Sequence, residues 1–156
     1  MDREHPKKLY ENAEKVITQY AIANEDEIWF VIDTDEWGKQ ISDIKNECAK
    51  KQNWYVAQSN PSFEIWLYYH FYNQKPEVKE VETANGLKAY VNQKINGGFD
   101  NRKHPVYIQT AVINSEHNFE HEDNEPKHFS TNLHELAKQI LPMIKDELDT
   151  IIRNAG

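Results

Sequence analysis

A short apolar run that ends in a cluster of carboxylates is the feature that most constrains this sequence. Residues 27–32 (EIWFVI) are rich in β-branched and aromatic side chains, which is typical of a strand buried on both faces of a parallel sheet. The run stops abruptly at residues 33–36 (DTDE). Ligands of parallel α/β sheets bind beyond the carboxyl ends of the strands. We therefore expect a strand that leads directly into a ligand site.

The hydrophobic pattern around that run predicts an α/β fold. Apolar residues recur at helical spacing over residues 7–23 and 39–51, and residues 54–57 (WYVA) are a second short strand candidate. The order helix, strand, helix, strand favours right-handed crossovers and parallel pairing. Asn60 and Pro61 are expected at the N-cap and first position of a helix over residues 61–72, which is apolar nearly all round and therefore buried.

The C-terminal half is predicted to be helical. Residues 1–75 would form an α/β core with a partial parallel sheet, and residues 76–156 a helical extension packed on it. The expected elements of the extension are a helix over residues 87–95, a helix beginning at Pro105, an acidic loop over residues 116–128, and a long helix that begins after Asn132 and is kinked at Pro142.

Composition excludes several classes of protein. The chain of 156 residues has 26 acidic against 18 basic residues, a net charge of −8, which disfavours autonomous DNA binding unless a metal ion or a partner supplies positive charge. A single cysteine, Cys48, excludes an internal disulfide and a cysteine-based zinc cluster. The N-terminal MDREHPKK is charged, and no apolar stretch approaches the ~20 residues of a membrane span. We expect a soluble, cytoplasmic protein.

The acidic segment predicts a metal site. Asp33 and Asp35 lie two residues apart just past the first strand, and at ~4 Å two carboxylates repel by about 1 kcal/mol in water and by more when partly desolvated. A hard divalent cation relieves that repulsion, and Mg²⁺ prefers one or two carboxylates together with water and substrate phosphates. Mg²⁺ or Mn²⁺ bound by Asp33 and Asp35 would therefore handle a phosphoryl group. The alternative is that these residues only cap the next turn.

A second polar segment follows the second strand. In residues 59–66 (SNPSFEIW), a helix N-terminus at the end of a strand offers free N–H groups to an anion, so Ser59, Asn60 and Ser62 are candidate substrate ligands. Glu64 would complete the metal shell, directly or through water. The alternative is that Asn60 is only a cap and Glu64 only complements the helix dipole. Among the histidines, His70 is expected in the core, and His117 and His121 in a solvated loop.

These segments carry a family resemblance. DEIWFVIDTDEW (Asp26 to Trp37), VAQSNPSFEIWLYYHF (Val56 to Phe71) and STNLHELAKQI (Ser130 to Ile140) together resemble the RloB family over nearly the whole chain. That family is similar to Toprim-fold proteins, in which a D-x-D pair at a strand end binds Mg²⁺, and Asp33 and Asp35 match that pair. The resemblance implies a Mg²⁺-dependent nuclease-type effector of bacterial antiphage defence that acts with an ABC/AAA-type ATPase, with catalytic roles for Asp33, Asp35 and Glu64.

One part of the Toprim pattern has no match. A Toprim domain begins with a strand that carries an essential glutamate, and nothing in residues 1–26 matches that strand and its acidic turn. The chain is then a truncated form, or another subunit supplies the missing strands, or the site is inactive. Because a sheet of two strands has unpaired edges, we expect it to pair with a second copy or with a partner.

Two other functions are compatible with these residues. A non-catalytic module that docks on the ATPase would use the aromatic segment over residues 63–72 and the helical half. A haloacid-dehalogenase-like phosphatase would use Asp33 as nucleophile and Asp35 as acid and base, but that family has Thr or Val where this chain has Trp37. The phosphatase is therefore the weaker alternative.

Overall fold

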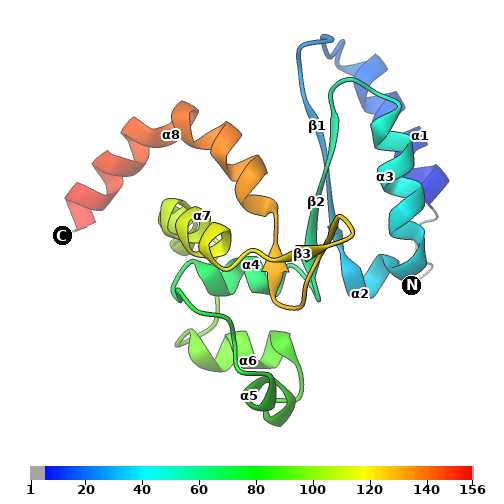
Figure 1. Ribbon diagram of the computed structural model, residues 1–156. Coiled ribbons are helices and arrows are strands. Elements are labelled where there is room, and N and C mark those ends of the chain that lie inside the picture. Colours follow the sequence, from blue (N-terminus) through cyan, green and yellow to red (C-terminus); the bar gives the residue numbers. More distant parts are fainter. Residues whose placement is uncertain (1–5, 156) are drawn as a thin grey trace. The chain divides into compact units, whose positions relative to one another are not determined.

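A computed structural model describes residues 6–155 of the chain (Figure 1). Residues 1–5 of the charged N-terminal segment lie outside the described residues. The chain forms two compact units, divided within its first two strands. The first unit comprises residues 1–31 and 37–56, and the second comprises residues 32–36 and 57–156.

The first half of the chain follows the predicted order of elements. Phe30 packs against Tyr10 of the first helix and Trp54 of the second strand, at ring-centroid distances of 6.1 and 5.1 Å. Between residues 6 and 27 the structure has no strand, so the first Toprim strand has no counterpart there. The elements are α1 (Pro6–Gln19), β1 (Ile28–Asp33), α2 (Thr34–Trp37), the 3₁₀ helix η1 (Gly38–Gln40), α3 (Ile41–Ala49) and β2 (Trp54–Asn60).

Strand β1 is not buried on both faces, which corrects the prediction. Phe30 and Ile32 are buried, whereas the Val31 side chain between them is 47% exposed. Successive side chains of a strand point to opposite faces, so one face of β1 is covered and the other is open. A continuous apolar run cannot distinguish these two cases, because the exposed positions are apolar too.

The sheet has a third strand that the sequence pattern did not reveal. The strand order is β1-β2-β5; β1 and β2 are parallel, and β5 (Ser130–Thr131) is antiparallel to β2. Ser59 lies opposite Thr131 and Asn60 opposite Ser130. The two-stranded sheet was therefore wrong, since β5 pairs with the end of β2. A strand of two hydroxyl residues is too short to show a period.

Helix α4 (Glu64–Tyr69) organises the core of the second unit. It packs against α6 (Leu87–Lys94), α7 (Ile108–His117) and β5. The Tyr69 hydroxyl donates to the Phe129 carbonyl at 2.7 Å, and the Asn114 amide donates to the Tyr69 carbonyl at 2.9 Å. The burial expected for the aromatic segment is thus confirmed for Ile65, Trp66, Tyr68 and Tyr69, whereas Phe63 and Phe71 are exposed. The core residues are Ile65, Tyr68, Tyr69, Val81, Leu87, Tyr90, Val91, Ile95 and Phe129.

The start of α4 differs from the prediction. Strand β2 extends through Asn60, and α4 begins only at Glu64, after Phe63, whose side chain makes no capping hydrogen bond. The Asn60 side chain donates instead to the Pro126 carbonyl at 2.8 Å. Asn60 is therefore not the N-cap of this helix. Strand pairing with β5 extends the pleated conformation past the point at which local propensity ends it.

The predicted acidic loop is a hairpin. Helix α7 continues through His117, and β3 (His121–Glu122) pairs antiparallel with β4 (Glu125–Pro126). The two turn residues, Asp123 and Asn124, have positive φ angles of 50° and 63°. Asp and Asn tolerate that conformation, which two-residue hairpin turns require. The Asp-Asn pair was the available signal for this turn.

The remaining helices are α5 (Val78–Thr83), the 3₁₀ helix η2 (His104–Tyr107) and α8 (Leu133–Ala155). Helix α8 begins directly after Asn132, as expected, and continues through Pro142. Figure 1 shows α8 bending along its length. None of the helices in the described part of the chain is long and apolar enough to cross a membrane.

Candidate functional site

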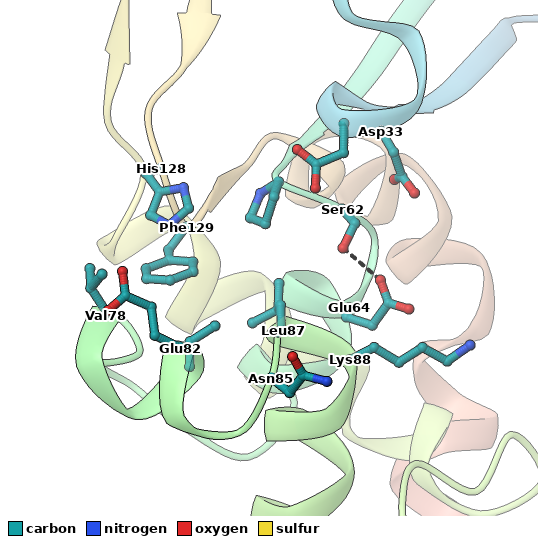
Figure 2. A pocket seen from close by; sticks show the side chains of 14 residues that line it. Asp33, Ser62, Glu64, Val78, Glu82, Asn85, Leu87, Lys88, His128 and Phe129 are labelled. Carbon is teal, nitrogen blue, oxygen red and sulfur yellow. Dashed lines mark hydrogen bonds between the residues drawn. The ribbon is translucent and has the colours of Figure 1, made fainter.

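A pocket of about 910 Å³ lies where β1 and β2 end (Figure 2). Asp33 is the last residue of β1, and Asp35 lies in the first turn of α2. The Asp35 backbone N–H donates to the Pro61 carbonyl at 3.0 Å, which fixes the turn after β1 to the turn after β2. The predicted site residues that line the pocket are Asp33, Asp35, Ser62 and Glu64.

Asp33 is the most perturbed carboxyl group of the pocket. Burial, and after it the negative charge of Glu64, raises the pKa of Asp33 from 3.8 to about 6. The Phe63 backbone N–H opposes this shift by donating a hydrogen bond, and Glu36 and Asp35 add smaller contributions in the raising direction. The shift therefore reflects burial and the surrounding carboxylates.

Glu64, rather than Asp35, is the principal charged neighbour of Asp33. It lies in the first turn of α4, where a negative charge is favourable next to the N-terminal end of the helix dipole. The Ser62 hydroxyl donates to the Glu64 carboxylate at 2.6 Å and restrains its position. Figure 2 shows the carboxylates of Asp33 and Glu64 on the same side of the pocket. The two strand ends thus bring two carboxylates together.

The predicted substrate ligands are divided between the sheet and the pocket. Ser59 is fully buried, and its hydroxyl is 2.9 Å from the Thr131 hydroxyl. Asn60 is bonded to the Pro126 carbonyl, as described above. Neither residue lines the pocket, whereas Ser62 does. Ser59 and Asn60 therefore support the sheet beneath the site in this structure.

Part of the pocket lining comes from residues that the sequence analysis did not identify as site residues. Glu82, Asn85 and Lys88, from α5 and the start of α6, line it together with His128. Lys88 is the one lysine or arginine among the lining residues. The Asn85-Gly86 pair, which starts α6, was a local turn signal, but nothing in the sequence indicates that this turn faces Asp33.

A buried hydrogen-bond network supports the turn that carries Asp33 and Asp35. The Gln58 side chain is 1% exposed, and its amide donates to the Thr34 hydroxyl at 3.0 Å and to the Glu125 carboxylate at 2.8 Å. The Thr34 hydroxyl in turn donates to the Ser59 carbonyl at 2.8 Å. Because Thr34 lies between Asp33 and Asp35, these bonds fix the backbone that presents both carboxylates.

The donor set fits Mg²⁺ or Mn²⁺ better than a metal that needs a complete protein cage. Among residues 6–155, no three His, Cys, Asp or Glu side chains gather closely enough to hold an ion by themselves. A zinc site would require three or four such ligands. Mg²⁺ is bound by one or two carboxylates and keeps several waters, and the hard oxygens of Asp33 and Glu64 match that requirement.

The raised pKa of Asp33 predicts a destabilising charge. The neutral acid is favoured in the folded chain, so its stabilising contribution is present below pH 3.8 and is lost as the pH rises through about 6. We expect Asp33→Asn to increase the free energy of unfolding by about 1–3 kcal/mol at pH 8 without divalent ions, and by much less at pH 4. Urea unfolding of both proteins at the two pH values measures this, and an equal difference at both would contradict it.

The chain was compared with known proteins. A family model described as "RloB-like protein" matches residues 1–140. No curated protein and no solved structure matches the chain.

Proposed function

The chain belongs to the RloB-like protein family, and from that membership and the acidic pocket we propose that it is a Mg²⁺- or Mn²⁺-dependent, nuclease-type effector. One observation carries the proposal: Asp33 and Glu64 line a single open pocket at the ends of two parallel strands, and the negative charge of Glu64 contributes to the raised pKa of Asp33. The ends of parallel strands are where α/β proteins bind ligands.

Each residue of the pocket has a distinct role in this proposal. Asp33 and Glu64 hold the metal ion, and Asp35 reaches it directly or through water. Bound there, the ion stabilises charge on the leaving oxygen of a phosphodiester and activates water. Ser62 orients Glu64 through its hydrogen bond. Lys88, which also lines the pocket, provides a positive charge for a substrate phosphate.

The wider role rests on the family resemblance. RloB-like proteins accompany an ATPase of the ABC/AAA type in defence loci, so the proposed setting is antiphage defence in the cytoplasm, with that ATPase as partner. The net charge of −8 supports the need for the metal ion or the partner when nucleic acid is bound. A second copy of the chain remains the alternative partner, and β1 is an edge strand of the sheet to which it could add.

Titration calorimetry with Mg²⁺ and Mn²⁺ tests the metal site. We expect one bound ion at pH 7.5, and an affinity that falls about tenfold per pH unit below pH 6, because the ion must displace the proton of Asp33. Incubation with labelled single- and double-stranded DNA and RNA, with Mg²⁺ or with EDTA, tests cleavage. Absence of both binding and cleavage at pH 7.5 would end the proposal.

A non-catalytic docking module is the second candidate, and α8 favours it. Four apolar side chains of α8 are exposed in the described part of the chain: Ile140, Met143, Ile151 and Ile152. Affinity capture from cells separates the candidates, since a docking module must recover an ATPase, and a protein that recovers none would contradict that role.

A further inference from the structure

Aromatic and basic side chains gather where α4 ends. The ring centroid of Phe71 lies 4.9 Å from that of His104 and 5.5 Å from that of Tyr107, both edge to face. The Phe99 ring also packs edge to face on His104, at a ring-centroid distance of 5.2 Å. Arg102 and Lys103 directly precede His104 in the chain. We call this set the aromatic–basic patch: Phe71, Phe99, Arg102, Lys103, His104 and Tyr107.

A buried histidine supports the patch, and two of the aromatic side chains of the patch are exposed to solvent. His70 is buried, donates a hydrogen bond from Nδ1 to the Trp66 carbonyl at 3.0 Å, and packs on Phe99 at a ring-centroid distance of 5.0 Å. The Phe71 and Tyr107 side chains are nevertheless 38% and 44% exposed. The Asp100 backbone N–H donates to Nδ1 of His104 at 2.9 Å, so the ring proton of His104 lies on Nε2 and is left to donate. Two aromatic rings are thus held in place and reach solvent.

The patch is nearly free of carboxylates in a strongly acidic chain. Asp100 is the one acidic residue in residues 65–75 and 95–115, where 26 acidic residues spread evenly over the chain would give about five. Asp100 is bonded to Arg102, whose side chain is almost fully exposed. Lys103 makes no ion pair within the described part of the chain. With Arg102 and Lys103 against Asp100, the loop that carries the patch has one net positive charge in a chain of net charge −8, which favours an anionic ligand here over the rest of the chain.

Helix α4 connects the patch to the acidic pocket. Glu64 begins α4 and Phe71 follows its last residue by two positions, so the two are seven residues apart, or about 10 Å at the rise of a helix. Helical hydrogen bonding continues past α4, since the Tyr72 N–H donates to the Tyr68 carbonyl. That separation corresponds to about three stacked nucleotides at ~3.4 Å each.

We propose that the aromatic–basic patch is a stacking platform for a single-stranded nucleic acid whose backbone continues into the acidic pocket. The inference rests on the proposed function and names its substrate class. Exposed rings stack on unpaired bases of any sequence, and cations follow the backbone. A duplex hides the base faces, and a helix of a partner protein would not require a surface so poor in carboxylates. The patch therefore selects single strands over duplexes.

Fluorescence anisotropy in EDTA tests the platform without cleavage. The probes are a labelled 12-nucleotide single-stranded DNA, the same sequence in RNA, and the matching DNA duplex. We expect the wild-type protein to bind a single strand more tightly than the duplex. The double variant Phe71→Leu with Tyr107→Leu retains apolar bulk but loses both π faces, and it should bind at least about fivefold more weakly. Lys103→Gln removes one positive charge, so the slope of log K against the logarithm of the salt concentration should become less steep by about 0.7.

Two control variants test whether binding depends on the patch itself, and the outcomes of the binding and cleavage assays separate this inference from the proposed function. Tyr20→Leu removes a 68% exposed aromatic side chain outside the patch and should leave binding unchanged. Lys145→Gln removes an exposed lysine of α8 outside the patch and the pocket, and it should leave the salt dependence of binding unchanged. If single-strand binding needs Phe71 and Tyr107 but no metal-dependent cleavage occurs, the platform stands and the nuclease fails. If the double variant binds as the wild type does, or if the wild type binds no single strand, the platform is wrong.

Discussion

Replacing Asp33 by asparagine is expected to abolish metal-dependent cleavage while leaving the fold intact. Asparagine matches aspartate in size but cannot supply the negative charge that binds a divalent ion. Loss of a metal contribution of several kcal/mol lowers the cleavage rate about 10³-fold, and Mg²⁺ affinity should fall at least about 100-fold. Calorimetry and a cleavage assay at pH 7.5 measure the two effects. The increased stability expected of the same variant excludes unfolding as the cause.

The neighbouring carboxylates allow a graded comparison. Glu64 is the charged group that affects Asp33 most, so Glu64→Gln should weaken Mg²⁺ binding nearly as much as Asp33→Asn. Asp35, whose influence on Asp33 is smaller, should have a smaller effect when changed to Asn. Asp146→Asn, on the exposed part of α8, removes a carboxylate outside the pocket and serves as the matched control. If Asp33→Asn and Asp146→Asn bind Mg²⁺ equally, the proposed metal site is wrong.

The acidic end of β1 could be predicted because its signal is local. An apolar run that stops at consecutive polar residues marks a strand end, and the positions of Asp33 and Asp35 follow from that end. The segment after β2 was predictable for a similar reason. Its strand and helix were both recognised, and Glu64 lies in the first turn of α4 as expected. What local pattern could not show is which of the two carboxylates, Asp35 or Glu64, would raise the pKa of Asp33 more.

Long-range pairing explains most of what sequence reasoning missed. Strand β5 is two residues long and exists because Ser130 and Thr131 lie opposite the end of β2, about seventy residues earlier. That pairing extends β2 through Asn60 and delays the start of α4. The part of the pocket lining that includes Lys88 and His128 was missed for the same reason. These residues reach the pocket only through the packing of α5 and α6 and the position of the chain before β5. None of these residues has a neighbouring pattern that points toward Asp33.

Truncating Tyr69 to alanine is expected to remove the largest share of stability of any change considered for this chain. Its side chain is fully buried in the core of the second unit, and its hydroxyl donates to the Phe129 carbonyl at 2.7 Å. Large-to-small changes of buried aromatic residues lower the free energy of unfolding by about 3–5 kcal/mol, through lost burial and the cavity that remains. Tyr69→Phe retains the ring and leaves the Phe129 carbonyl without this donor, so we expect a loss of about 1 kcal/mol.

Chemical unfolding of the two variants shows whether α4 supports both proposed surfaces. Tyr69 lies between Glu64, at the pocket, and Phe71, in the patch, on the same short segment. If the core aligns that segment, Tyr69→Ala should weaken both Mg²⁺ binding and single-strand binding at temperatures where the variant is still folded, whereas Tyr69→Phe should preserve both. A Tyr69→Ala protein that loses less than about 1 kcal/mol would contradict the packing described for Tyr69. One that loses stability but retains both binding activities would show that the two surfaces do not depend on the alignment of α4.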